Sequence, residues 1–192
     1  MTAMNIKHLL AVLLLSAVTA SAGGDTLSTL EGVAGGGYVY NISDFEYGVS
    51  GLRRNGGNAF ARVLWSPEHI LDVGLEFGFT NLYGIDPPAS SAVTRSSLVA
   101  YPIYIVASMT PLTNFSATVG FGTAILSSVV ETDAGTTGTT SASTSVFGAI
   151  QYMAPVADKL QIGGELRLSS FDRYRDANVS FNVLVSYSLV TF

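Results

Sequence analysis

The sequence predicts an all-β chain that forms an eight-stranded antiparallel up-and-down transmembrane β-barrel. Three observations support this fold class. Eight segments alternate apolar with small or polar residues, three of the prolines recur at equal intervals, and no apolar run after residue 22 is long enough for a spanning helix. Because lipid satisfies no backbone hydrogen bonds, a chain that crosses a bilayer without such a helix must close its strands into a barrel.

The alternation is clearest in the last segment, residues 177–192. One parity is apolar there and the other is small and polar, with Leu184 as the exception. A period of two gives a strand one apolar and one polar face. The same pattern predicts strands over residues 30–41, 58–66, 71–80, 99–109, 115–129, 145–153 and 160–168. Pro102 lies inside one of them and has no N–H to donate, which predicts a bulge or local irregularity.

Pro67, Pro111 and Pro155 are each 44 residues from the next and lie between alternating segments. Proline favours the second position of a tight turn, so each is expected to mark a short hairpin turn. Longer polar stretches alternate with these prolines along the chain, at residues 41–58, 84–97, 131–141 and 172–177. Short turns would therefore gather at one end of the barrel and long loops at the other, as in outer-membrane barrels, where the short turns and the termini are periplasmic.

The apolar faces are expected to contact lipid. A soluble barrel of the lipocalin type uses the same alternation with its apolar face inward. Here the polar faces are rich in Gly, Ser and Thr, which suit the tight interior of eight strands, while the other faces are bulky and aliphatic. Aromatic residues near the predicted strand ends would form two girdles at the membrane interfaces: Tyr38, Tyr40, Trp65, Phe79, Phe115, Tyr152, Phe181 and Tyr187.

The first 22 residues are expected to be a cleaved secretory signal peptide, which leaves residues 23–192 as one barrel domain. Lys7 precedes an apolar run over residues 9–20, and Ala20-Ser21-Ala22 forms an A-x-A cleavage site. The alternative, a membrane-spanning anchor, needs about 20 apolar residues. The chain contains no Cys, so disulfides and thiolate metal sites are excluded. Its net charge of −5 gives no support for a nucleic-acid partner.

Inward parity gathers charged residues in the predicted interior. An unpaired buried ion costs several kcal/mol, so these charges need partners. Two interpretations remain open: an ion-paired plug that fills the interior, which an eight-stranded barrel favours, and a gated ion path. The residues of this predicted lumen cluster are Glu31, Arg62, Asp72, Glu76, Glu165 and Arg167.

The predicted outer loops carry cations that are candidates for pairing with lipopolysaccharide phosphates. Their alternative role is to solvate the loops. The candidates are Arg53, Arg54, Arg95, Arg173 and Arg175. The third loop contains Thr136, Thr137, Thr139, Thr140 and Ser141, without charge, and is interpreted as a flexible surface epitope or adhesive tip.

The A-x-A site, the eight alternating segments, the proline-marked turns and the terminal Phe192 make the chain resemble the small eight-stranded outer-membrane barrels of the OmpA transmembrane-domain and OmpX type. The resemblance implies a Gram-negative outer membrane and recognition by the barrel-assembly machinery. It also implies that Phe192, and with it Val190, belongs to the C-terminal assembly signal. Phe192 has the parity of Val190 and not of Leu189, so the face must switch through a bulge or the last residues must leave the ladder.

The resulting functional prediction is a non-enzymatic outer-membrane protein with a structural or surface-interaction role through its outer loops. The alternatives are a narrow pore for ions or small solutes and a lipid-A-modifying barrel enzyme. Against the enzyme, the chain after residue 22 has one histidine, His69, in a predicted periplasmic turn, and no G-x-S-x-G or H-E-x-x-H motif. No cofactor and no metal site are expected.

Overall fold

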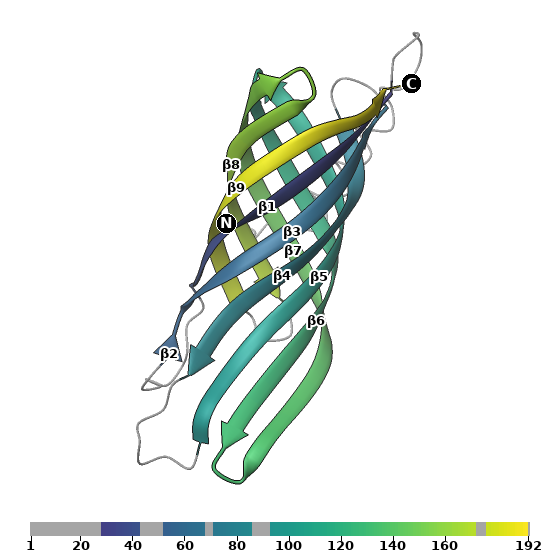
Figure 1. Ribbon diagram of the computed structural model, residues 1–192. Coiled ribbons are helices and arrows are strands. Elements are labelled where there is room, and N and C mark those ends of the chain that lie inside the picture. Colours follow the sequence, from purple (N-terminus) through teal and green to yellow (C-terminus); the bar gives the residue numbers. More distant parts are fainter. Residues whose placement is uncertain (1–27, 43–51, 68–70, 86–92, 172–175, 192) are drawn as a thin grey trace, which may run out of the picture.

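The structure is a computed structural model, and it describes residues 28–42, 52–67, 71–85, 93–171 and 176–191. These residues form one antiparallel sheet in which eight strands close into a ring through the pairing of β1 with β9, while the short β2 adds to β4 beyond the end of β3 (Figure 1). The predicted fold class is confirmed. The strands are β1 (Thr29–Asn41), β2 (Leu52–Arg53), β3 (Asn55–Ser66), β4 (Leu71–Ile85), β5 (Val93–Leu112), β6 (Phe115–Thr132), β7 (Gly135–Ala157), β8 (Leu160–Phe171) and β9 (Asp176–Thr191).

The bulky apolar residues of the strands point outward. Leu75, Phe77, Val119 and Leu166 keep 49%, 53%, 37% and 51% of their surface exposed. The alternate residues of the same strands are buried, as a period of two requires. A closed barrel with an apolar exterior and a filled interior is the arrangement expected for a lipid-facing band. The predicted inward position of Leu184 agrees with its complete burial.

Pro67 lies in the connection between β3 and β4, as predicted, but Pro111 and Pro155 lie beside the tight turns and not within them. Residues 113–114 connect β5 to β6, and residues 158–159 connect β7 to β8. Pro111 and Pro155 lie in the strands just before these turns, where the register shifts. Asn114 takes the left-handed conformation, with φ of 69°, which asparagine tolerates better than most residues. We call the end with these two turns the turn end, and the opposite end the loop end.

The prediction of a flexible loop over residues 131–141 is wrong. Strands β6 and β7 continue to Thr132 and from Gly135, so two residues, Asp133 and Ala134, connect them. Threonine favours extended backbone, and Thr139 and Thr140 oppose Ser128 and Ser127 of β6, which are cross-strand pairs that stabilise a ladder. This β6–β7 hairpin reaches furthest at the loop end, at the bottom of Figure 1. Predicted loop residues on the β5 side, including Arg95, also lie in a strand.

Irregular strand pairing was expected at two places, at Pro102 and near the C-terminus. Pro102 forms no bulge, because the β5–β6 register is constant through it, but it does interrupt the β4–β5 ladder: pairing stops at Phe77 with Ile103 and resumes in the same register at Thr80 with Ala100. The shift between β4 and β5 lies instead between Asn81 and Tyr83. Near the C-terminus, β9 does contain the expected irregularity, because Leu30 pairs with Val190 while Glu31 pairs with Ser188. The extra residue, Leu189, lets the exposed face change parity.

Neighbouring strands approach closely where one of them has a glycine. A Cβ atom added there would collide with a backbone carbonyl oxygen of the adjacent strand, so even alanine does not fit without a backbone shift. Among the described residues, five such glycines occur in four strand pairs: Gly37 of β1 against β9, Gly74 of β4 against β3, Gly56 of β3 against β4, Gly122 of β6 against β5, and Gly163 of β8 against β7.

Candidate functional site

Four buried charged side chains meet inside the barrel, and we call them the charged layer: Arg62, Glu76, Glu165 and Arg167. Arg62 Nη2 lies 2.6 Å from Glu76 Oε2 and 3.2 Å from Glu165 Oε2. Arg167 Nη1 lies 2.7 Å from Glu76 Oε1, and its Nε lies 2.7 Å from Glu165 Oε1. Each guanidinium therefore contacts both carboxylates, and the charges of the layer balance.

The strand register explains why these residues meet. Arg62 and Glu76 are direct cross-strand partners on β3 and β4. Glu165 and Arg167 are two residues apart on β8, so both point to the same side of the sheet. An eight-stranded barrel is narrow enough for side chains from different parts of its wall to reach one another.

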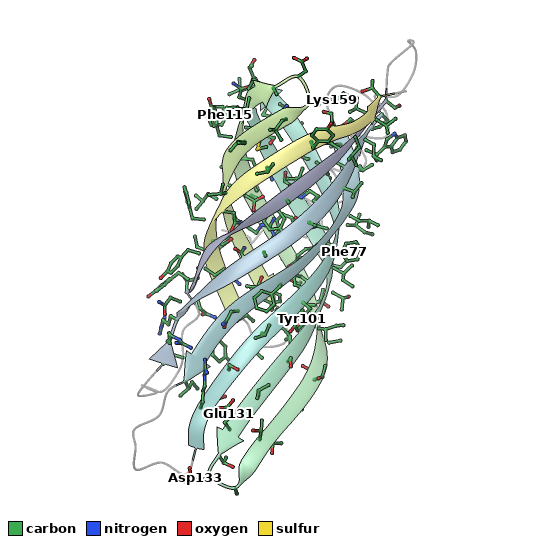
Figure 2. The ribbon with its side chains drawn as sticks, viewed as in Figure 1. Phe77, Tyr101, Phe115, Glu131, Asp133 and Lys159 are labelled. Carbon is green, nitrogen blue, oxygen red and sulfur yellow. The ribbon has the colours of Figure 1, made fainter. Side chains whose placement is uncertain are left out.

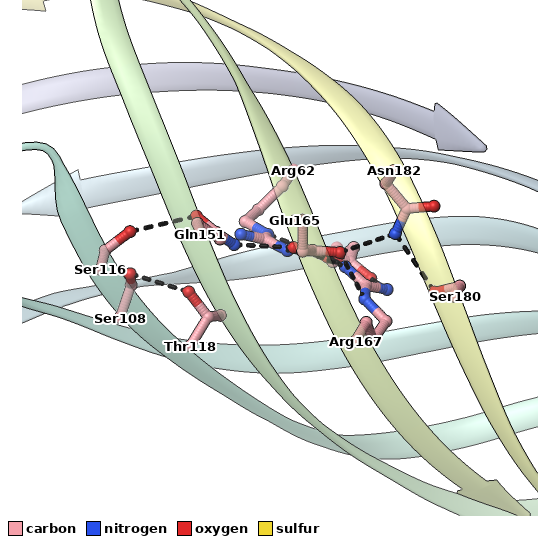
Figure 3. A network of polar contacts seen from close by, with 10 residues as sticks. Arg62, Ser108, Ser116, Thr118, Gln151, Glu165, Arg167, Ser180 and Asn182 are labelled. Carbon is pink, nitrogen blue, oxygen red and sulfur yellow. Dashed lines mark hydrogen bonds and ion pairs between the residues drawn. The ribbon is translucent and has the colours of Figure 1, made fainter. Parts of the chain in front are cut away.

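Amide and hydroxyl groups complete the network around Glu165 (Figure 3). Gln151 Nε2 donates a hydrogen bond of 2.7 Å to Glu165 Oε2, and Asn182 Nδ2 donates one of 2.9 Å to Oε1. Ser116 in turn donates to Gln151 Oε1 at 3.3 Å. A buried carboxylate needs such donors, because each unsatisfied lone pair in a dry interior costs free energy.

Two phenylalanines hold the guanidinium of Arg167 between their rings. Its Cζ lies 4.2 Å from the ring centroid of Phe60 and 4.0 Å from that of Phe147. Arg62 lies further from both rings, at 5.3 and 5.9 Å. Tyr104 packs edge-on against Phe147 at 4.8 Å. Cation–π attraction is strongest where water is excluded, so these inward aromatics contribute to the layer. These aromatics were not among the predicted lumen residues, although their inward parity was the available signal.

The other two predicted lumen residues lie apart from the charged layer. Glu31 accepts a hydrogen bond from Ser186, and Asp72 is hydrogen-bonded by Ser66. Both line a cavity of about 190 Å³, whose walls also include Ser108 and residues of the tight turns and their flanking strands, such as Asn114. The structure thus divides the predicted cluster into an ion-paired layer and an acidic cavity at the turn end.

Apolar side chains fill the interior toward the loop end. This apolar layer is almost completely buried, and Phe171 from β8 meets leucines from β4, β5 and β6 in it. Among the described residues, the interior therefore changes along the barrel axis, from the acidic cavity at the turn end through the charged layer to an apolar layer near the loop end. The apolar layer consists of Leu82, Leu98, Ala100, Ala124, Leu126 and Phe171.

The eight predicted girdle aromatics are all exposed on the outer surface. Near the turn end, Phe115 pairs with Tyr152 at a ring-centroid distance of 5.0 Å. Near the loop end, Phe79 packs against Tyr101 at 5.8 Å. Trp65 and Tyr187 also lie in the turn-end half of their strands, while Tyr38, Tyr40 and Phe181 lie toward the loop end. Figure 2 shows the side chains that project around the barrel, with Phe77 and Tyr101 between Phe115 at one end and Asp133 at the other.

The predicted lipopolysaccharide contacts lie at the loop end where the structure describes them. Arg53 is in β2, Arg54 follows it, and Arg95 is in β5 opposite Glu131. Val190 is exposed beside the Leu189 irregularity. Arg173, Arg175, His69, Phe192 and the predicted signal peptide lie outside the described residues.

The described residues contain no group of three or more His, Cys, Asp and Glu side chains that is placed to hold a metal ion. Within the same ranges, no helix is long and apolar enough to cross a membrane.

Comparison with solved structures gives the fold. The attachment invasion locus protein Ail of Yersinia pestis, in complex with the heparin analogue sucrose octasulfate, matches with a TM-score of 0.55 over 85% of this chain and 98% of its own, at 11% identity. Neisserial surface protein A matches with a TM-score of 0.53 over 86% of this chain and 100% of its own, at 12% identity. This chain has the fold of the small eight-stranded outer-membrane β-barrels. No protein-family model and no curated protein matches the sequence of this barrel.

Proposed function

We propose that the protein is an integral outer-membrane barrel without catalytic activity, and that its role is structural or lies in surface contacts made at the loop end. In this proposal the tight turns and termini face the periplasm. The observation that carries it is the β6–β7 hairpin, which continues past Ser145, the last residue of β7 that pairs with β8 at the loop end. Its threonines are exposed, so it presents an ordered polar surface away from the lipid-facing band.

The filled interior favours this role over the narrow pore. A solute would have to cross the charged layer, whose members are 0–6% exposed, and then the apolar layer. Ions pass apolar constrictions poorly, because they must lose their hydration without replacement ligands. The acidic cavity at the turn end is lined by Glu31 and Asp72 and lies on the other side of the charged layer from the hairpin.

Single cysteines test the location and the orientation, because the natural chain has none. Thr137→Cys lies on the hairpin and Thr113→Cys in a turn at the opposite end, and both threonines are exposed. A membrane-impermeant maleimide should label Thr137→Cys in intact Gram-negative cells and label Thr113→Cys only after the outer membrane is opened. Equal labelling of both, or the reverse pattern, would contradict the proposal.

We further propose that the loop-end arginines bind anionic groups, with lipopolysaccharide phosphates as the first candidate. Ail was solved with a sulfated ligand, so heparin is a practical second probe. The variant Arg53→Gln/Arg54→Gln/Arg95→Gln should weaken binding of the detergent-purified barrel to both anions, and the loss should shrink at high salt. Lys159→Gln removes an exposed cation from the turn end and is the matched control. Equal binding by the two variants would show that the cations only solvate the loops.

The C-terminal assembly signal is also a proposal. Val190 and Phe192 would present apolar side chains to the barrel-assembly machinery. Phe192→Ser should lower the yield of folded protein in the outer membrane, while refolding of the purified chain into detergent stays unchanged. Equal loss in both settings would indicate a simple defect of stability.

A further inference from the structure

The loop-end part of the β6–β7 hairpin extends beyond the neighbouring strand β8. Strand β7 pairs with β6 from Gly135 onward, but its pairing with β8 begins only at Ser145. Among the described residues, the segment Gly135–Ser141 therefore has a strand on one side alone. Every second residue of such a segment directs its N–H and C=O away from the existing ladder. These groups form a template for one more strand.

This edge lacks the features that usually prevent strand pairing. Natural edge strands are protected by lysines, prolines, bulges or short length. The segment Gly135–Ser141 contains only Gly, Thr and Ser, without charge or proline, and its register with β6 is continuous. Nothing in its composition repels another uncharged strand.

The sequence of the edge is nearly palindromic about Gly138. When the strand is paired antiparallel with a copy of itself at Gly138, Thr137 opposes Thr139 and Thr136 opposes Thr140 of the copy. The next pair outward is Gly135 with Ser141, which are both small. A two-fold interface requires such self-complementarity, and opposed threonines stabilise an antiparallel pair.

The geometry decides where the copy must come from. The two-fold axis of an antiparallel pair can run perpendicular to the sheet, and it then reverses both the strand direction and the barrel axis. Two barrels in one membrane have parallel axes, so they cannot form this pair. Two barrels whose loop ends point at each other can form it, with the hairpins side by side.

We propose that the β7 edge pairs with the β7 edge of a second copy held in an opposing membrane, centred on Gly138, and so joins two membrane surfaces. This deepens the proposed function, since it depends on the hairpin being at the cell surface. The pair is short, so one contact is weak, and arrays of barrels on facing membranes supply the avidity.

Cysteine cross-linking tests the register in full-length protein held in phosphatidylcholine nanodiscs, which leave both ends of the barrel accessible. Gly138→Cys should form a disulfide-linked dimer under mild oxidation, because directly opposed residues of antiparallel strands have Cα atoms about 4.5–5.5 Å apart, within disulfide range. The added Cβ fits, since its nearest neighbour is the Ser128 carbonyl oxygen at 3.9 Å.

Thr136→Cys and Thr140→Cys provide the matched controls. Each alone should cross-link poorly, because two copies of the same cysteine would lie about 13 Å apart along the strands. A mixture of the two should cross-link well. Equal cross-linking of all samples, or none with Gly138→Cys, would overturn the proposal.

A charge exchange provides the second measurement. Thr136→Lys/Thr140→Lys places like charges opposite each other and should abolish the light-scattering increase that follows concentration of wild-type nanodiscs. Thr136→Glu/Thr140→Glu should do the same, and mixing the two variants should restore association. The proposal would be contradicted if wild-type nanodiscs failed to associate, or if the mixture of the two variants failed to recover association. If these tests fail while Thr137→Cys is labelled on intact cells, the pairing is wrong and the proposed orientation stands.

Discussion

Arg62 and Glu76 face each other directly across β3 and β4, and two nitrogens of the guanidinium, Nε and Nη2, donate to the same carboxylate oxygen at 2.8 and 2.6 Å. The second oxygen of Glu76 accepts from Arg167 at 2.7 Å. One carboxylate is therefore shared by two buried guanidiniums, and its charge is needed by both.

Removing that charge should be costly. In Glu76→Gln the two guanidiniums keep one carboxylate, Glu165, between them, and breaking a buried ion pair typically costs about 3–5 kcal/mol. We expect a loss of that order in the free energy of unfolding, measured by urea titration in detergent micelles. Glu131→Gln, at an exposed position near the loop end, is the control and should change stability little. Similar values for the two variants would mean that the charged layer is not a determinant of stability.

The aromatic rings around Arg167 should also contribute. Phe147→Leu keeps an apolar side chain but removes the ring 4.0 Å from the guanidinium, and we expect a loss of about 2 kcal/mol or more. Phe121→Leu, on the outer face with 53% exposure, makes the same chemical change in the lipid-facing band. Equal effects in the same urea titration would assign the cost to lost apolar area alone.

The close approach of β3 and β4 should make Gly74 intolerant of a side chain. Gly74→Ala puts a Cβ against the carbonyl oxygen of Val63, so we expect destabilisation of about 1–3 kcal/mol or failure to reach the folded gel band. Gly148→Ala is the matched control, because no atom lies within 4 Å of its added Cβ. Folding can be scored by heat-modifiable gel migration. A Gly74→Ala barrel as stable as wild type would show that the strands can shift apart.

The outward aromatic girdle can be tested through the one tryptophan of the chain, Trp65. Its exposed side chain lies near the turn-end edge of the band, so lipids brominated close to the headgroup should quench its fluorescence most. In the variant Trp65→Phe/Phe77→Trp the new tryptophan lies between the girdles and should respond most to bromines deep in the acyl chain. The same depth profile for both proteins would contradict the assignment of a girdle.

Conductance measurements test the layered interior. In planar bilayers the wild-type protein should show no steady openings, because the charged and apolar layers both block the lumen. Steady openings that disappear in Glu76→Gln and Arg167→Gln would support the pore.

Periodicity predicted the barrel well because the environment of each strand is two-sided. The inward positions of Arg62, Glu165 and even the exceptional Leu184 followed from parity alone. Parity does not give the position of a residue along the barrel axis, however. It therefore grouped Glu31 and Asp72 with the charged layer, although they line the acidic cavity at the turn end. Parity placed Phe60 and Phe147 inward as well, but it could not show that their rings enclose a cation.

Polar composition was a poor guide to where strands end and where connections begin. The threonines of residues 136–140 suggested a loop, but threonine is also a strong strand former, and the ladder with β6 decides between the two. Pro102 suggested a bulge or local irregularity, and the outcome is the second: the β4–β5 ladder is interrupted beside it, while the register of both neighbouring ladders continues past it.

The charged layer consists of two parts that come together when the ring of strands closes. One half of the layer, Arg62 with Glu76, belongs to adjacent early strands, and the other half, Glu165 with Arg167, belongs to a single late strand where the two side chains already bond at 2.7 Å. Each half is electrically neutral by itself. Ring closure therefore joins two pieces of the charged layer that are each already charge-balanced, so no lone ion has to enter the interior.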